Sequence, residues 1–371
     1  EKILELLENS WKDRDFRVVI EITMQETFEV ITKKWHDWLK KQYYPDLSDV
    51  EISSLIAGGL STQGFNAKPN YFRFEDGTRK VYFVGNLNGL GNVYEVEIDD
   101  DFHPVKRPEV LILGERTDEF EAFHLFESRI SVSAQGDLAF VTKSGGKDVV
   151  HVYDLIGDKL RATFRFDDLI AVYSPSWSPD GKDFVFTAIT RSGFSDLYVY
   201  RTQTDELQQL TSDTFDDRDP AWSPDGKFIA FSSDRSAFGK EGAYNIFTYG
   251  IEDGLVRYVT YGDRTDFSPG WSPDGTNLAF ISTVRDDTGK FGAQDIWVAD
   301  MSYQLGNARS VASMEPGILS EEPQWRNLRR LTSLVAASFD PVWTDDNHII
   351  FTSFEGLSFT VRQLAQVDSL L

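Results

Sequence analysis

Residues 175–181 read Pro175-Ser-Trp-Ser-Pro-Asp-Gly181, and nearly the same heptapeptide returns as Pro220-Ala-Trp-Ser-Pro-Asp-Gly226 and Pro269-Gly-Trp-Ser-Pro-Asp-Gly275. A weaker fourth copy is Pro341-Val-Trp-Thr-Asp-Asp-Asn347. Each copy suits a strand that enters a tight turn, because proline fixes φ, aspartate can bond its own backbone and glycine accepts a positive φ. The motif therefore predicts a repeated β-hairpin.

The spacing of the turn residue indicates how many units there are. The turn residues are Gly77, Gly136, Gly181, Gly226, Gly275 and Asn347, at steps of 59, 45, 45, 49 and 72 residues. Units of about 40–45 residues with four short strands each are typical of propeller blades, and the two long steps indicate insertions near residues 100–125 and 300–330. We predict an all-β fold, a six-bladed β-propeller. We expect a strand from residues 50–62 to close it alongside the last blade, because a closed ring leaves no free edge.

Large aromatic side chains recur at fixed stations of the repeat. Four residues before the turn lie Trp177, Trp222, Trp271 and Trp343, and five residues after it lie Phe186, Phe231 and Phe280. Rings at equivalent positions fill the wedge between neighbouring blades, so we predict that they are core. The first two units have Arg73 and Val132 at the tryptophan station.

The first 45 residues follow a different, helical period. Ile3, Leu6 and Leu7, and later Phe28, Ile31, Trp35, Trp38 and Leu39, recur at helical spacing. Lysines precede Pro45, which predicts that the helix ends near Tyr44. We therefore divide the chain into a helical appendage at 1–45 and the propeller at 46–371, with Pro45 and Asp46 in the linker. The chain opens at Glu1 with this pattern already running and shows no signal peptide, which indicates a fragment of a longer precursor.

Composition and charge restrict the class of partner. The 371 residues contain 60 acidic and 37 basic side chains, a formal charge of −23, and no cysteine. Such a field repels phosphate backbones, so nucleic acid is not expected as a partner. No apolar run reaches the roughly 18–20 residues of a membrane-spanning helix. The lack of cysteine fits an oxidising compartment.

Catalytic motifs are missing from the sequence. The five histidines never form His-Glu-x-x-His, no Gly-x-Ser-x-Gly is present, and no glycine-rich phosphate loop precedes Lys-Ser or Lys-Thr. We predict a chain without a catalytic site or cofactor. Structural Ca2+ is the alternative for the acidic clusters, although the calcium-loop spacing is lacking. These clusters are Asp99, Asp100 and Asp101; Asp167 and Asp168; Asp213, Asp216, Asp217 and Asp219; and Asp286 and Asp287.

The repeated Pro-x-Trp-Ser-Pro-Asp-Gly, followed by Ile-Ala-Phe and then Asp-Ile-Trp, resembles the TolB-like (WD40-like) propeller repeat of periplasmic proteins. The same repeat occurs in propellers that gate prolyl-oligopeptidase-type enzymes. The helical stretch from Phe28 to Pro45 looks like the C-terminal helices of peptidase-MA-like, gluzincin-type domains that precede such propellers in some bacterial envelope proteins. The resemblance implies a periplasmic or outer-membrane-associated location, and its zinc motif would lie outside this sequence.

Candidate contact residues precede the inner strand of each blade, where a propeller opens its central channel. The candidate segments are 171–174, 216–219, 264–268 and 337–340, and from them we select Tyr173, Arg218, Asp219, Arg264, Asp266, Phe267, Phe339 and Asp340. Aromatic and arginine side chains are the usual anchors of protein interfaces. For Asp219 and Asp340, bracing of the following strand is an equally good interpretation.

The function expected from these observations is a non-catalytic, protein- or peptide-binding scaffold of the bacterial cell envelope, within an envelope assembly. One alternative is the accessory propeller of a larger zinc metallopeptidase, gating substrates for a domain upstream of Glu1. Another is a propeller hydrolase or lyase that uses carboxylates in the channel, whose separation a sequence does not give.

Overall fold

The computed structural model describes residues 2–47, 50–62, 64–87, 89–114, 120–191, 193–235, 242–284, 292–302, 327–335, 337–345, 347–365 and 367. The chain divides into two compact units, Glu1–Glu51 and Ile52–Leu371. The first is helical, and the second consists almost entirely of strands.

Three helices form the first unit: α1 (Lys2–Asn9), α2 (Phe16–Met24) and α3 (Phe28–Leu47). Asp15 caps α2 by accepting a hydrogen bond from the Arg17 N–H, and Gln25 ends it in the left-handed conformation. The predicted end of the last helix near Tyr44 is wrong, because α3 continues through Pro45 to Leu47. Proline has a helical φ and forfeits one hydrogen bond, so it does not stop the last turn. Among the described helices, none combines the length and apolar character that a bilayer crossing requires.

Few side chains of the helical unit are buried. In α2 the buried residues are Val19 and Thr23. Apolar side chains are widely exposed: Trp11 is 79% exposed, Trp35 56% and Trp38 54%. An apolar surface of this kind is typical of a segment that packs against a further protein surface.

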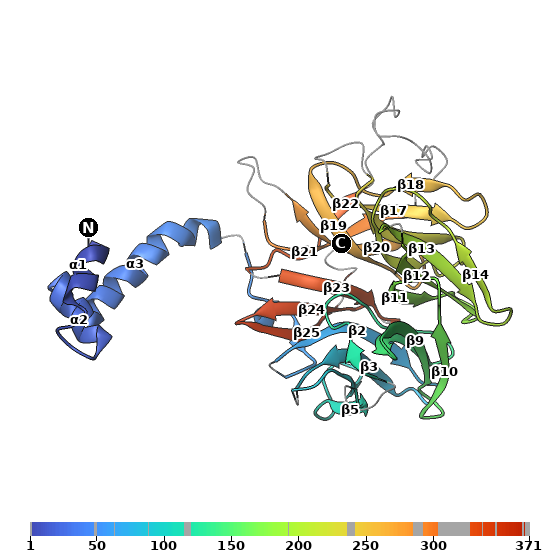
Figure 1. Ribbon diagram of the computed structural model, residues 1–371, viewed down its shortest axis with the longest axis horizontal. Helices are drawn as coiled ribbons and strands as arrows, with labels where there is room; N and C mark the ends of the chain where they lie inside the picture. The colour runs from blue at the N-terminus through green and yellow to red at the C-terminus, as the bar shows by residue number, and fades with distance from the viewer. Residues whose placement is uncertain are drawn as a thin grey trace. The chain divides into compact units, whose positions relative to one another are not determined.

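Six sheets form the second unit, as the turn spacing predicts. The first three contain β2 (Asn66–Arg73), β3 (Arg79–Gly85), β4 (Asn92–Ile98) and β5 (Glu109–Ile112); β6 (Ala122–Phe123), β7 (Ser131–Val132), β8 (Asp137–Ser144), β9 (Lys147–Asp154) and β10 (Lys159–Arg165); and β11 (Ala171–Trp177), β12 (Asp183–Ile189), β13 (Ser195–Arg201) and β14 (Glu206–Gln209). The last three contain β15 (Asp217–Trp222), β16 (Phe228–Ser233), β17 (Asn245–Gly250) and β18 (Val256–Tyr258); β19 (Arg264–Trp271), β20 (Asn277–Val284), β21 (Asp295–Asp300) and β22 (Leu328–Arg330); and β23 (Ala337–Trp343), β24 (Ile349–Glu355) and β25 (Ser358–Leu364). Figure 1 shows these blades following one another in chain order, from blue β2 through green β11 and yellow β17 to red β24.

The ring is closed by a strand from the start of the second unit. After the short helix α4 (Ser53–Ile56), β1 (Gly58–Gly59) pairs antiparallel with β25 and completes the last blade. The Leu60 N–H adds a hydrogen bond to the Val361 carbonyl. The predicted closure by residues 50–62 is therefore confirmed.

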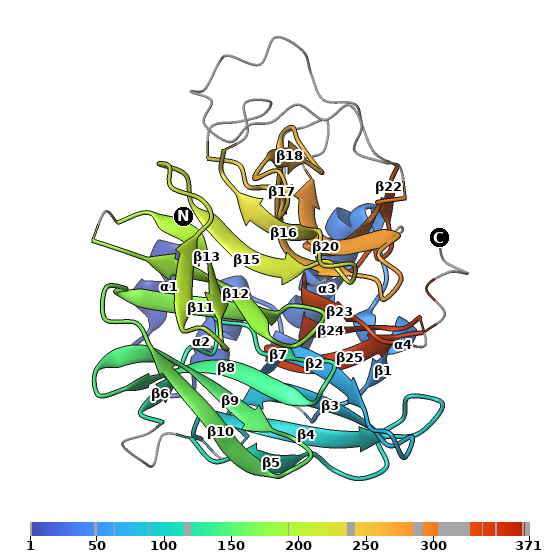
Figure 2. The ribbon, with the colours of Figure 1, turned by 90° about the vertical axis from the view of Figure 1, so that its right-hand side faces the viewer.

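The core consists of six apolar clusters, one between each pair of neighbouring blades. Figure 2 shows such a pair, with β8, β9 and β10 beside β3, β4 and β5. Phe186, Phe231 and Phe280 are fully buried in these wedges, as predicted. Each ring of this size removes ~150–250 Å2 of surface from water. Packing on both faces of every sheet stabilises the circle.

The turn residues have the backbone conformation that the repeat demands. Gly181, Gly226 and Gly275 have φ of 66°, 73° and 71°, and Asn347 has φ of 59° in the equivalent turn. Asparagine tolerates this left-handed region better than most residues other than glycine, so the sixth unit keeps the turn.

The assignment of Arg73 to the tryptophan station is wrong. In the other blades, each tryptophan of this station lies three residues after a residue with positive φ. In the first blade the residue with positive φ is Lys68. The aromatic side chain at the station is therefore Tyr71, which stacks on Phe102. Arg73 lies two residues further on, because β2 and β3 extend their pairing beyond that point to Arg73 and Arg79.

Candidate functional site

The first strands of the blades surround the axis of the ring. Each lies against the first strands of both neighbours, in the order β2, β7, β11, β15, β19, β23 and back to β2. The candidate segments lie largely inside these strands and not before them, which corrects the sequence-based placement. Strand pairing begins before the proline motif, because each strand pairs on both sides of a β-bulge next to the proline.

A β-bulge interrupts five of the first strands at the same station. The bulged residue precedes proline and has φ between 50° and 58°; the five are Lys68, Ser174, Asp219, Ser268 and Asp340. Proline fits here because an interrupted ladder needs no N–H donor. A bulge turns its side chain away from the regular alternation, and a left-handed non-glycine residue costs about 1–2 kcal/mol. Five such residues require compensating interactions.

The bulged side chains bond to one another around the axis. Lys68 Nζ lies 3.1 Å from Asp340 Oδ1, and Ser268 Oγ lies 3.2 Å from the same oxygen. Asp219 continues the chain, with Oδ2 3.5 Å from Ser268 Oγ and Oδ1 3.3 Å from Ser174 Oγ. These five residues, from five blades, form a polar girdle.

In the second blade the equivalent position is occupied by Arg129, which is followed by Ile130 in place of proline. Its backbone N–H donates to Ser174 Oγ at 3.3 Å, and the Ser174 N–H donates to Ser128 Oγ at 2.9 Å. The Arg129 guanidinium donates to the Pro269 carbonyl at 2.9 Å, from the second blade to the fifth. The girdle, defined as Lys68, Arg129, Ser174, Asp219, Ser268 and Asp340, is thereby crossed by a side chain.

The girdle favours a bracing role for Asp219 and Asp340. Asp340 is 2% exposed, and one of its oxygens already serves Lys68 and Ser268. Lys68 pairs with Asp340, the Ser268 hydroxyl lies between the two carboxylates, and the Ser174 hydroxyl contacts Asp219. Carboxylates held in this way are poorly placed to exchange protons with a substrate.

Four predicted contact residues occupy one equivalent station, directly before the bulge: Tyr173, Arg218, Phe267 and Phe339. Arg218 is the most open, with 55% of its side chain exposed. Its guanidinium lies 2.7 Å from Asp216 Oδ2 and 4.9 Å from the Tyr244 ring, and the Tyr244 hydroxyl donates to Asp216 at 3.0 Å. Arg218 is thus held in a fixed orientation while accessible.

Tyr173 belongs to a smaller network. Its ring packs edge-on against His124 at 5.3 Å, and His124 Nε2 lies 2.8 Å from Asp148 Oδ1. Burial would raise the pKa of Asp148, but hydrogen bonds from His124 and Lys143 outweigh burial and hold that pKa below its usual range. Burial also raises the pKa of Tyr173. The phenol therefore stays protonated as a hydrogen-bonding group.

The prediction that Arg264 and Asp266 contact a partner conflicts with their burial, at 6% and 0% exposed. Arg264 Nε lies 2.8 Å from Asp266 Oδ1, and its guanidinium lies 5.5 Å from the Phe280 ring and 4.9 Å from Trp297. Alternate residues of a strand face opposite sides. Residues 264 and 266 therefore share one face of β19, with Arg264 lying against Phe280 and Trp297. Phe267 lies on the opposite face, where it is half-buried against the apolar cluster between the fifth and sixth blades.

Phe339, selected from the sequence, lies in a group of phenylalanines whose other four members sequence reasoning missed; two of the five, Phe354 and Phe359, lie in β24 and β25. Phe359 lies 5.2 Å from Phe65, 6.2 Å from Phe126, 5.9 Å from Phe339 and 4.8 Å from Phe354, measured between ring centroids. Phe126 is 67% exposed. We call these five residues the phenylalanine group. They come from three distant segments and only Phe339 has a repeat station, so the sequence contains no signal for them.

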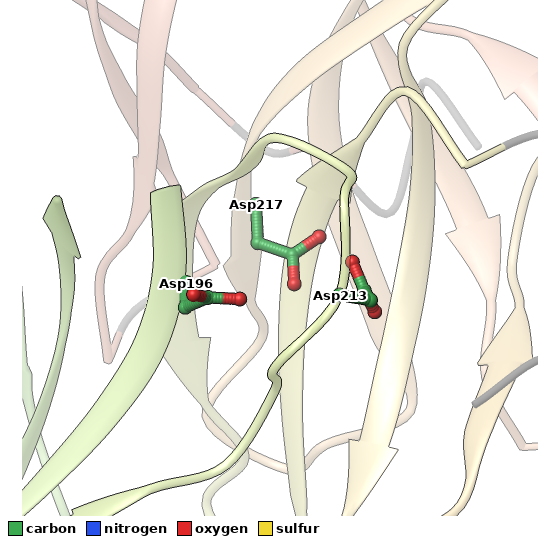
Figure 3. A group of neighbouring side chains, drawn as sticks. All are labelled: Asp196, Asp213 and Asp217. Atoms are coloured by element: carbon green, nitrogen blue, oxygen red, sulfur yellow. The ribbon is translucent and has the colours of Figure 1, made fainter. Parts of the chain in front are cut away.

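The described residues contain one group with the spacing of metal ligands, Asp196, Asp213 and Asp217, whose carboxylate oxygens lie within 4.8 Å of one another. Figure 3 shows their side chains converging. Arg235 already pairs with two members of the group, with Nη2 2.6 Å from Asp217 and Nη1 3.0 Å from Asp213. Burial and the charge of Asp217 raise the pKa of Asp196 to about 6. Calcium would have to displace the guanidinium to gain six or more oxygens.

The other predicted calcium ligands show no such convergence in the described part of the chain. Asp99 accepts hydrogen bonds from the N–H groups of Asp101 and His103, as in an ordinary turn. Asp167 pairs with Lys147 at 2.7 Å. Asp286 and Asp287 lie outside the described residues.

This closed ring of six blades around a central axis, five with four strands and one with five among the described residues, defines the class, a β-propeller. A model of the TolB beta propeller domain family, PD40, matches residues 128–326, more than half of the chain. The chain belongs to this family.

Solved structures with related folds include a putative TolB from Agrobacterium tumefaciens, with a TM-score of 0.50, 20% identity, and coverage of 82% of this chain and 92% of that chain. TolB from Acinetobacter baumannii aligns with a TM-score of 0.44 and 18% identity over 77% of this chain, which spans 64% of that protein. A structure described as one of two prolyl endopeptidases aligns with a TM-score of 0.46 and 12% identity over 90% of this chain and 46% of that one. No curated protein sequence matches. At these identities the likeness concerns the fold alone.

Proposed function

We propose that this chain is a non-catalytic scaffold of the bacterial cell envelope that binds a protein or peptide through the side chains around the axis. The observation that supports this proposal is that Tyr173, Arg218, Phe267 and Phe339 occupy equivalent positions, directly before the bulge of four first strands. Rigid aromatic side chains and an oriented, accessible arginine are the usual anchors of interfaces. Membership of the TolB propeller family supports a periplasmic setting.

The absence of catalytic motifs and the bracing hydrogen bonds of Asp219 and Asp340 support a binding role over hydrolysis. Both carboxylates are held by hydrogen bonds within the girdle and not oriented towards a substrate as a general acid or base would be, which favours binding over the hydrolase or lyase alternative. The proposal needs no cofactor.

A second candidate is the accessory propeller of a larger zinc peptidase. The exposed Trp11, Trp35 and Trp38 of the helical unit favour it, since they suit packing against a further domain of the peptidase-MA-like kind. Gating through the axis would require the Arg129–Pro269 bond to open. A His-Glu-x-x-His motif elsewhere in the same polypeptide would favour this candidate.

The test is affinity capture from envelope extract with the wild-type chain and with Arg218→Glu plus Phe267→Ala. We expect the double variant to lose the main partner, because it reverses one anchor and removes another. The matched control is Lys182→Glu plus Leu207→Ala, which makes the same charge reversal in a hairpin and shortens a smaller apolar side chain in the outer strand β14. Equal recovery of every partner by both double variants would overturn the proposed site.

A further inference from the structure

The phenylalanine group is an accessible apolar surface beside the girdle. Phe126 lies 4.7 Å from Phe65, and both pack on Phe359, which completes a continuous set of rings with Phe339 and Phe354. Phe126 keeps 67% of its surface exposed. A contiguous apolar surface on a folded protein usually marks an interaction site.

The surroundings of this group are acidic. Glu127, next to Phe126, is 66% exposed, and Glu355, next to Phe354, is 29% exposed. The basic side chains nearby are engaged: Lys68 pairs with Asp340, Arg362 lies 3.6 Å from Glu355, and the Arg129 guanidinium donates to the Pro269 carbonyl. The exposed carboxylate at the edge of the rings is that of Glu127, which lies 3.5 Å from His124 Nδ1.

The propeller as a whole adds a negative field. Of the 60 acidic and 37 basic side chains, 12 and 8 lie in residues 1–51, which leaves 48 and 29 in the ring. A cationic segment is attracted by such a field, and its on-rate rises. Phenyl faces also attract ammonium and guanidinium groups within about 6 Å.

We propose that the phenylalanine group binds a peptide segment in which an aromatic or large aliphatic side chain is flanked by lysine or arginine. The apolar anchor packs on Phe126 and Phe359, and the cations lie towards Glu127. The girdle directly beyond Phe339 blocks passage along the axis, so the peptide lies across the surface and does not thread through the ring. This inference rests on the proposed binding function and names its ligand chemistry.

The test is selection of random dodecapeptides displayed on phage against the full chain. We expect the selected pool to be enriched in aromatic residues next to lysine or arginine, relative to the unselected library. A synthetic peptide of the consensus sequence should bind Phe126→Ser about tenfold more weakly, and binding should weaken in high salt. Phe194→Ser removes another exposed phenylalanine outside the group and should bind as wild type does.

Three outcomes would overturn the inference. One is a pool without aromatic enrichment or with acidic enrichment, and another is unchanged binding of the consensus peptide to Phe126→Ser with its fold intact by thermal unfolding. The third is a concentration-dependent dimer that Phe126→Ser abolishes, which would make a second copy the occupant. If polar or acidic peptides still require Arg218 and Phe267, the proposed function stands and this inference falls. If neither Phe126→Ser nor Arg218→Glu plus Phe267→Ala changes binding, both the inference and the proposed function are overturned.

Discussion

Asp216 and Asp217 are neighbours in the sequence, yet they lie in two different regions of the blade. Asp217 is fully buried and pairs with Arg235, whereas Asp216 pairs with Arg218, whose side chain is 55% exposed. Along β19, Asp266 is likewise fully buried, whereas the next residue, Phe267, is only half-buried. Neighbouring residues of a first strand thus differ in burial: one is fully enclosed in a wedge between blades, and the next keeps part of its surface available to a partner.

The largest expected effect is on the buried side. Asp217→Ala leaves the buried Arg235 guanidinium with one carboxylate, Asp213 at 3.0 Å, and the Ser233 hydroxyl, and breaking a buried pair costs about 3–5 kcal/mol. Asp216→Ala removes a partly exposed partner and should cost about 1 kcal/mol or less. Denaturant unfolding of both variants measures the difference. Equal losses would show that the buried pair of Asp217 and the partly exposed pair of Asp216 do not differ in their contribution to stability.

A histidine extends the comparison to pH. His151 is fully buried between the rings of Phe120 and Phe140 and bonds Thr142 and Thr163. Burial lowers its pKa to about 4, so between pH 6.5 and 4 the unfolded chain binds the proton and the native protein does not. This stability is fully present above pH 6.5 and is lost as the pH falls through 4, an effect of about 3 kcal/mol.

The measurement is the free energy of unfolding of wild type and His151→Gln at pH 7.5 and pH 4.5. The wild type should lose more stability between the two values than the variant loses. His103→Gln alters an exposed histidine and serves as the control. Parallel losses in wild type and His151→Gln would exclude the buried ring as the source.

The smallest expected effect on stability is beside the axis. Arg218→Glu breaks a partly exposed ion pair and should change the free energy of unfolding by about 1 kcal/mol or less. A loss above about 2 kcal/mol would place Arg218 with the structural residues, and impaired partner capture would then reflect instability.

Most of the fold followed from turn chemistry and spacing. Glycines and an asparagine at equivalent turn positions predicted six hairpins, and the need to leave no free edge predicted closure by residues 50–62. The residues of the candidate site were harder to predict from the sequence. Strict alternation along β19 would have predicted that Arg264 and Asp266 share a buried face, but the bulge before Pro269 hides where the alternation restarts. In the first blade the longer pairing of β2 and β3 moved the aromatic station to Tyr71.

The sequence by itself determined the number of blades, their turns and the aromatic wedges, because these depend on local backbone preferences repeated at a fixed spacing. Only the tertiary structure decided which side chains meet at the axis. The girdle takes one residue from each of six blades, and the phenylalanine group joins three segments far apart in the chain. Such contacts depend on how the ring closes, and no local pattern records that geometry.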